Sequence, residues 1–137
     1  MSNEDYKLSP EDRKLLAKDL YQRLGTNTLV QDMKYIKTNR PIPIWLVDTI
    51  MEEVRLFADE PWIPIDTVRP YLRSMSSMTE EELKEYDDWH LELEAGKIKE
   101  WKFADYIDWL VDNKFDYRGL IPKGLALEAK EGMYEKK

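Results

Sequence analysis

The hydrophobic positions of the N-terminal segment follow a helical period. Residues 9–25, SPEDRKLLAKDLYQRLG, carry a leucine at positions 16, 20 and 24, a spacing of four that lines one face of a helix. Ser9 and Pro10 favour a helix start, and Gly25 favours its end. The pattern therefore predicts an amphipathic helix whose leucines pack into a core. The opposite face carries four cationic residues, Arg13, Lys14, Lys18 and Arg23.

The middle of the chain, residues 29–72, is rich in β-branched and aromatic residues and predicts strands. Pro41 and Pro43 exclude a continuous helix at that point. We interpret MKYIK, PIWLV, EEVRLFA and WIPI as short strands, and DTVRPYL at 66–72 as a turn with a short extended exit. A helix over 44–58 is an alternative, because its apolar residues also fit one helical face: Val47, Ile50, Met51, Val54 and Ala58. Periodicity alone leaves this alternative open, and we favour strands.

Two further helices are predicted in the C-terminal half of the chain. Thr79 and Glu82 have the spacing of a capping box, so we expect a helix that begins near 80 and fades near Ala95-Gly96. Residues 101–114 carry apolar side chains at helical spacing, and residues 115–137 form an irregular tail. The sequence thus predicts one α+β domain over residues 1–137. It contains an N-terminal helix, a small antiparallel sheet or partial barrel from about 30–72, two C-terminal helices and the tail.

The negative charge of the chain is concentrated in one segment. The net charge is −7, and residues 80–94, EEELKEYDDWHLELE, carry eight acidic residues and one lysine. The absence of a basic stripe argues against direct binding of nucleic acid. A solvated helix face explains the segment most simply, but it could also attract a basic partner. The acidic candidates for partner binding are Glu81, Glu85 and Asp88.

The residue types that carry most catalytic chemistry are missing or wrongly spaced. The chain has no cysteine, one histidine, and five glycines that match neither GxGxxG nor GxxxxGK. The best metal candidate is Asp87, His90 and Glu94, which share a face if the helix continues through them. The alternating pattern of HLELE would scatter these side chains if the helix ends earlier. We therefore expect no cofactor and no catalytic residue, and we keep a metal-dependent enzyme as a second alternative.

Aromatic residues are abundant, with five Trp, eight Tyr and three Phe. Most are expected in the core. Trp45 and Trp62 neighbour prolines in the β-rich middle and are candidates for an exposed patch, because aromatic side chains are common anchors of protein interfaces. Asp116 and Arg118 lie in a predicted turn, where we expect Asp116 to cap the turn and Arg118 to pair with a surface carboxylate.

Three stretches of the chain resemble a known group of proteins. They are KLSPEDRKLLAKDLYQRLG at the start, VRPYLRSMSSMTEEE at 68–82 and FDYRGLIPKGLALEAKEGMY at 115–134. The group consists of short, uncharacterised proteins encoded by gut anaerobic bacteria, their prophages and mobile elements. Residues 26–64 depart from it. The resemblance implies a mobile-element origin and an accessory binding role, and it implies no reaction, ligand or site residue.

Together these features lead to one main hypothesis for function. The polar N-terminus and the lack of a long apolar run predict a cytoplasmic protein that does not enter the membrane. The leading hypothesis is a small accessory protein of phage or mobile-element origin that binds another protein through the aromatic middle, the acidic face, or both. The alternative is an acidic DNA mimic that inhibits a nucleic-acid-binding host protein.

Overall fold

The computed structural model describes residues 6–35, 40–56, 60–96 and 99–134. It has the predicted α+β architecture, with three α-helices and two sheets. The helices are α1 (Pro10–Gln22), α2 (Glu80–Glu94) and α3 (Glu100–Asp112). The strands are β1 (Leu29–Asp32), β2 (Ile42–Pro43), β3 (Leu46–Asp48), β4 (Glu53–Arg55), β5 (Ile63–Pro64), β6 (Val68–Leu72) and β7 (Leu127–Glu128).

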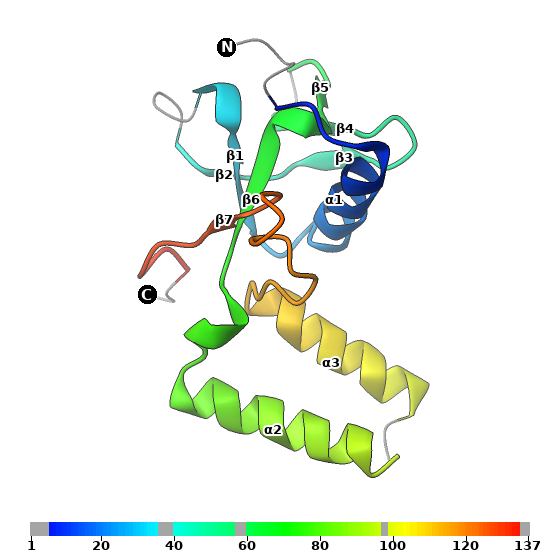
Figure 1. Ribbon diagram of the computed structural model, residues 1–137, viewed down its shortest axis with the longest axis vertical. Coiled ribbons are helices and arrows are strands. Elements are labelled where there is room, and N and C mark those ends of the chain that lie inside the picture. The colour runs from blue at the N-terminus through cyan, green and yellow to red at the C-terminus, as the bar shows by residue number, and fades with distance from the viewer. Residues whose placement is uncertain (1–5, 36–39, 57–59, 97–98, 135–137) are drawn as a thin grey trace.

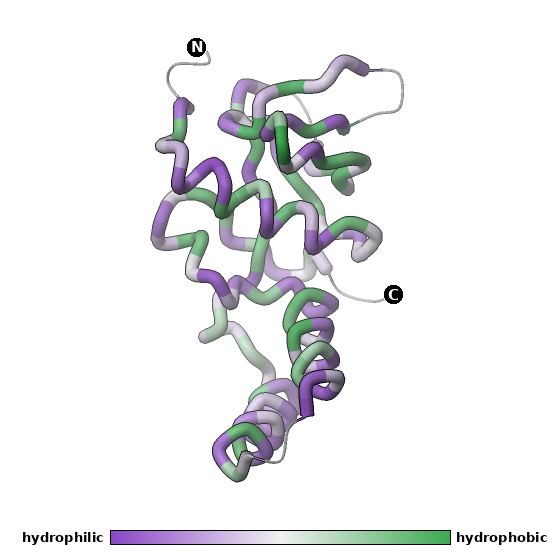
Figure 2. Tube along the Cα trace, turned by 90° about the vertical axis from the view of Figure 1, so that its right-hand side faces the viewer, coloured by the Kyte–Doolittle hydropathy of each residue, from purple (hydrophilic) through white to green (hydrophobic). Residues whose placement is uncertain are grey.

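The elements are distributed over two parts of the molecule (Figure 1). Helix α1 and the seven strands form one end, which we call the body. Helices α2 and α3 form the other end, which we call the helical hairpin. Figure 2 shows the same division from the side. Within the described segments, no helix combines the length and apolar character needed to cross a membrane.

Helix α1 begins where its sequence predicts. The Ser9 hydroxyl accepts a hydrogen bond from the Asp12 amide (3.1 Å), and Pro10 occupies the first turn. Leu16 and Leu20 are fully buried. They belong to a body core whose buried members are all aliphatic: Leu16, Ala17, Leu20, Val30, Ile44, Val47, Val54, Ile65, Val68, Leu72, Leu120, Leu125 and Ala126.

The strands form two separate sheets that do not close into a barrel. One sheet has the order β2-β1-β6-β7, and the other has the order β3-β4-β5. All pairings are antiparallel except the parallel pair β6–β7. Strands β3 and β4 lie within 44–58, so the strand interpretation of that segment is confirmed and the helical alternative is wrong.

Two expectations for the middle of the chain need correction. MKYIK was expected to be a strand, but Met33–Tyr35 form a 3-10 turn, and the strand lies just before it in β1; residues 36 and 37 lie outside the described residues. Residues 66–72 are more than a turn and a short exit. All five residues of β6 are buried, because β6 lies inside its sheet between β1 and β7.

Helix α2 of the hairpin begins with the predicted capping box. The Glu82 amide donates to the Thr79 hydroxyl (3.2 Å), and the Thr79 amide donates to the Glu82 carboxylate (2.9 Å). The helix runs to Glu94, yet none of its residues is buried. A second, smaller core lies between the hairpin helices and the loop after them. Its buried members are Tyr106, Leu110 and Phe115.

Candidate functional site

The structure brings the two candidate tryptophans of the middle segment together on the β3-β4-β5 sheet. Trp45 precedes β3 and Trp62 precedes β5, and the two residues are 48% and 38% exposed. Arg55, the last residue of β4, lies between them. Its Cζ atom is 5.8 Å from the ring centroid of Trp45 and 5.9 Å from that of Trp62. We call Trp45, Leu46, Arg55 and Trp62 the Trp patch.

The strand register explains why Leu46, Arg55 and Trp62 meet. Leu46 pairs with Arg55, and Val54 pairs with Ile63. Side chains alternate along a strand. Val54 is fully buried on the inner face, so its neighbour Arg55 points outward. The Arg55 Nε atom also donates to the Glu60 carbonyl (2.7 Å), which holds the guanidinium against the segment that carries Trp62.

The β3–β4 turn adds apolar surface at the end of the same sheet. Ile50 is 89% exposed and Met51 is 66% exposed. The turn is well ordered by hydrogen bonds, because the Asp48 carboxylate accepts from the amides of both residues (3.0 Å each). The turn therefore presents two ordered apolar side chains to solvent next to the exposed tryptophans of the same sheet.

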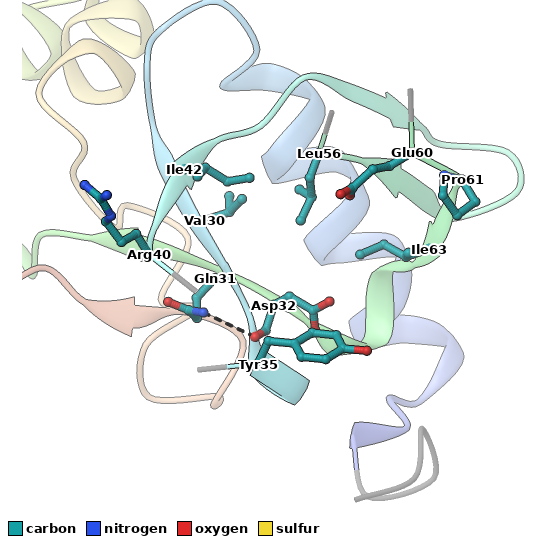
Figure 3. Close-up of a pocket in the computed structure, with 10 residues that line it drawn as sticks. All are labelled: Val30, Gln31, Asp32, Tyr35, Arg40, Ile42, Leu56, Glu60, Pro61 and Ile63. Atoms are coloured by element: carbon teal, nitrogen blue, oxygen red, sulfur yellow. Dashed lines mark hydrogen bonds between the residues drawn. The ribbon is translucent and has the colours of Figure 1, made fainter. Parts of the chain in front are cut away.

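A cleft of about 590 Å³ lies between the two sheets, behind the segment that carries Trp62. Its apolar wall comes from Val30, Ile42, Leu56 and Ile63. The polar residues at its rim include Asp32, Tyr35, Arg40 and Glu60. Figure 3 shows the side chains of Ile42, Leu56 and Ile63 pointing toward one another, with the Glu60 carboxylate beside Leu56. None of the Trp-patch residues lines this cleft.

The acidic candidates of α2 differ from one another in their contacts. Glu81, Glu85 and Asp88 are all exposed. Glu85 nevertheless has a structural contact, because its carboxylate accepts a hydrogen bond from the Trp109 indole of α3 (2.5 Å). Glu82, which is not a candidate, forms a bidentate ion pair with Arg73 (2.6 and 2.7 Å). This hydrogen bonding from Arg73 lowers the pKa of Glu82. Glu81 and Asp88 are therefore the acidic residues to test as a free surface.

The metal candidate is not assembled. Among the described residues, no group of three or more His, Asp and Glu side chains is arranged to hold a metal ion. Asp87 is exposed, as is Glu94 at the end of α2. His90 instead faces α3, where its Nε2 atom lies 3.1 Å from the Tyr106 hydroxyl, and its ring packs on Tyr86 (4.2 Å between centroids).

The turn at 116–118 is a structural clasp, as predicted, with one difference. The Asp116 carboxylate caps the turn by accepting from the amides of Leu120 (2.7 Å) and Ile121 (2.9 Å). Among the residues that the structure describes, Arg118 pairs with no surface carboxylate. Its Nε atom lies 3.2 Å from Asp19, which is fully buried on α1.

The clasp also contains a buried arginine that the sequence analysis placed on the polar face of α1. Arg23 is fully buried, and its Nε atom lies 2.8 Å from Asp19. Its Nη2 atom donates to the Phe115 carbonyl (2.7 Å). The clasp therefore joins α1 of the body to the loop after α3 through contacts of Asp19, Arg23 and Arg118.

Comparison of the chain with protein-family models, with curated protein sequences and with solved structures gives no match. Sequence reasoning named Trp45 and Trp62 as candidates for an exposed patch, and both are exposed, but it included neither Arg55 nor the cleft. Both depend on which strands pair, and no local signal in the sequence shows that pairing.

Proposed function

We propose that this chain is a protein-binding module that uses the Trp patch to anchor its partner. The observation that carries the proposal is the exposed arrangement of Trp45 and Trp62 on either side of Arg55. Trp and Arg are the residue types most enriched at the energetic centres of protein interfaces. The exposed turn of Ile50 and Met51 extends the apolar surface of the same sheet. An origin in phage or mobile elements is proposed from the sequence resemblance alone.

Binding a partner costs the side-chain entropy of the groups that become ordered at the interface. A partner gains most when the groups that it buries are already ordered, because little side-chain entropy is then lost. The Glu60 carbonyl holds Arg55, and Arg55 lies within cation–π distance of both indoles. The patch is thus pre-organised, and burial of two indoles removes a large apolar area from water.

The test compares capture of host proteins by three forms of the full chain. The first is wild type, the second is Trp45→Ala/Trp62→Ala, and the third is Trp101→Ala. Trp101 is a matched control, because it is 65% exposed but lies on α3 in the hairpin. Proteins captured from host lysate are identified by mass spectrometry, and the affinity of each captured protein is then measured with purified components.

We expect a partner that binds wild type and Trp101→Ala alike, and that binds the double variant at least about thirtyfold more weakly. Thermal unfolding checks that all three forms are folded, which we expect because the substituted side chains are exposed. Equal binding by all three forms would exclude the Trp patch as the anchor. Loss of binding only in Trp101→Ala would move the interface to the hairpin.

A second candidate function is mimicry of DNA by the helical hairpin. The observation in its favour is that exposed acidic residues lie on both hairpin helices: Glu80, Glu81, Glu85, Asp87, Asp88, Glu94, Glu100, Asp105, Asp108 and Asp112. A surface of one sign attracts a DNA-binding protein by the same long-range field as the phosphate backbone.

The mimicry hypothesis is tested by Glu81→Lys/Asp88→Lys, which leaves the structural contacts of Glu82 and Glu85 intact. Glu131→Lys, an exposed acid near the C-terminus, is the control. If the hairpin mimics DNA, duplex DNA should displace the captured partner. The partner should bind the double variant about tenfold more weakly than wild type at low salt, and it should bind Glu131→Lys as tightly as wild type. A partner that stays bound in the presence of excess duplex DNA would exclude this function.

A further inference from the structure

We propose that the cleft between the two sheets binds a ligand that carries an ammonium or guanidinium group on a short apolar stem. This inference goes beyond the protein-binding function, because the cleft uses none of the Trp-patch residues. It rests on three observations: the shape of the cleft, its apolar wall, and two carboxylates at its rim.

The cleft has the size and wall of a ligand site. Its volume of about 590 Å³ lies within the usual range for small-molecule pockets, roughly 300 to 1,000 Å³. Val30 comes from β1 and Ile42 from β2, whereas Leu56 follows β4 and Ile63 belongs to β5. The wall is thus made by both sheets, and an apolar stem placed there would be removed from water on two sides.

The charge at the rim is unbalanced. Figure 3 shows the carboxylates of Asp32 and Glu60 at the rim and the Arg40 side chain directed away from the apolar wall. One Asp32 oxygen accepts from the Lys34 amide (3.1 Å). Within the described part of the chain, neither carboxylate forms an ion pair with a cationic side chain. The described lining thus carries two carboxylates and one guanidinium, and the guanidinium is directed away from the apolar wall. This excess of negative charge favours a cationic ligand and disfavours an anionic one.

The apolar wall strengthens this preference. A low-polarity surface beside a carboxylate reduces the local dielectric, so a cation that reaches the rim gains more than it would in open water. A ligand that has an apolar stem and a cationic group can contact the wall and the acidic rim at the same time. The stem would cover the apolar wall, and the cation would lie between Asp32 and Glu60. A free amine and a lysine or arginine side chain of a bound peptide share this chemistry.

The experiment titrates the isolated, ¹⁵N-labelled full chain with three small probes and follows the amide resonances of Val30, Asp32 and Ile63. The probes are hexylamine, hexanol and hexanoate, which share one stem and differ in charge. We expect saturable shifts for hexylamine with a dissociation constant on the order of 1–10 mM, as for other ligands of this size. Hexanol should bind about fivefold more weakly, and hexanoate should not saturate.

Two substitutions remove the charge with little change in shape. Asp32→Asn keeps an oxygen for the Lys34 amide, and Glu60→Gln alters an exposed residue, so both chains should fold. The double variant should bind hexylamine about tenfold more weakly and hexanol as wild type does. Glu53→Gln is the control, because Glu53 lies on β4 but does not line the cleft. Equal binding of hexylamine and hexanol to wild type would overturn the charge preference.

A second arm distinguishes the two sources of the ligand. The probe is the capped peptide acetyl-Val-Lys-Val-amide. Tighter binding of this peptide than of hexylamine assigns the cleft to a side chain of a bound polypeptide, and binding of hexylamine alone assigns it to a free amine. The absence of saturable shifts from either probe up to about 50 mM, well above the affinity range expected for such ligands, overturns the site. Because no protein partner is present, that failure says nothing against the Trp patch.

Discussion

The body and the helical hairpin are held together by different kinds of contact. The buried core of the body is entirely aliphatic. The buried members of the hairpin core cluster are Tyr106, Leu110 and Phe115, and half of the partly buried residues packed against them are aromatic. Trp89 lies 5.6 Å from Tyr106, and Trp109 lies 5.6 Å from Phe115, measured between ring centroids. Aromatic side chains therefore belong to the core cluster of the hairpin, whereas the core cluster of the body contains none.

The two cores differ in residue type because the body and the hairpin differ in how completely they can bury a side chain. An aliphatic side chain contributes in proportion to the apolar area that it removes from water, and the two sheets and α1 bury such side chains in the body. Tyr, Trp and His also carry a polar atom, so they can pack at an edge and still form hydrogen bonds. In the hairpin, Tyr106 contacts His90, and the Trp109 indole donates to Glu85. Such contacts can join two helices without burying any residue of α2.

The clasp between the two parts offers the largest predicted effect. Asp19→Ala removes the carboxylate that both Arg23 and Arg118 contact. It leaves Arg23 buried without its acidic partner, so we expect the free energy of unfolding to fall by about 3–5 kcal/mol. Urea unfolding, followed by circular dichroism, measures the change.

A matched variant separates charge from packing in the clasp. Asp19→Leu/Arg23→Leu removes both fully buried charges, so it should destabilise less than Asp19→Ala alone. A loss below about 1 kcal/mol for Asp19→Ala would show that the body and the hairpin do not depend on the buried pair.

The ion pair at the start of α2 gives the next effect. Glu82→Gln weakens the pair with Arg73 and the capping box, and we expect a loss of about 2 kcal/mol at pH 7. Because hydrogen bonding from Arg73 lowers the pKa of Glu82 in the folded state, this stability is present above the unfolded pKa of about 4.3. It is lost as the pH falls through the folded pKa.

The measurement is urea unfolding of wild type and Glu82→Gln at pH 7, 5 and 3. The difference between the two proteins should persist at pH 5 and shrink at pH 3. Glu81→Gln, a change at an exposed neighbour, serves as the control and should have little effect at any of these values. If the difference in the free energy of unfolding between wild type and Glu82→Gln does not change with pH, the charge of the Glu82 carboxylate does not stabilise the start of α2.

Substitution of Tyr134 shows whether contacts of the C-terminal tail stabilise the body. The Tyr134 hydroxyl accepts from the Leu29 amide (2.8 Å) and donates to the Tyr71 carbonyl (2.7 Å). Tyr134→Phe should therefore cost about 1 kcal/mol. Burial raises the pKa of Tyr134 to about 12, so its contribution is fully present below the unfolded pKa of about 10 and is lost as the pH rises toward 12. Guanidinium unfolding of both proteins from pH 8 to 11 should show the difference narrowing; a constant difference would contradict the raised pKa.

The sequence predicted those features that depend on neighbours along the chain. The Ser9 cap and the Thr79–Glu82 capping box form as expected, because each bond joins residues three positions apart. The strand interpretation of 44–58 also held, since the nearby prolines disfavour a helix. Features set by distant residues were missed. Arg23 lies on the polar face of α1 by periodicity, but the loop at 115–118 covers it.

The candidate site shows the same limit. Trp45 and Trp62 could be singled out by residue type, but only the β3-β4-β5 pairing places Arg55 between them. The misplaced strand at MKYIK has a similar cause. The apolar pattern alone does not show whether 29–32 or 33–37 forms the strand. The antiparallel pairing of β1 with β6 places the strand in the earlier segment.

The smallest predicted effect compares two ion pairs of equal length. Lys102 of α3 lies 2.8 Å from Glu92 of α2, the same distance as Arg23 to Asp19. The side chains of Lys102 and Glu92 are 35% and 41% exposed, whereas those of Arg23 and Asp19 are fully buried. Solvent screens the exposed pair, so a double-mutant cycle of Lys102→Ala and Glu92→Ala should give less than about 0.5 kcal/mol and decline with salt. A coupling above about 1 kcal/mol would mean that charge, rather than aromatic contact, joins the two helices of the hairpin.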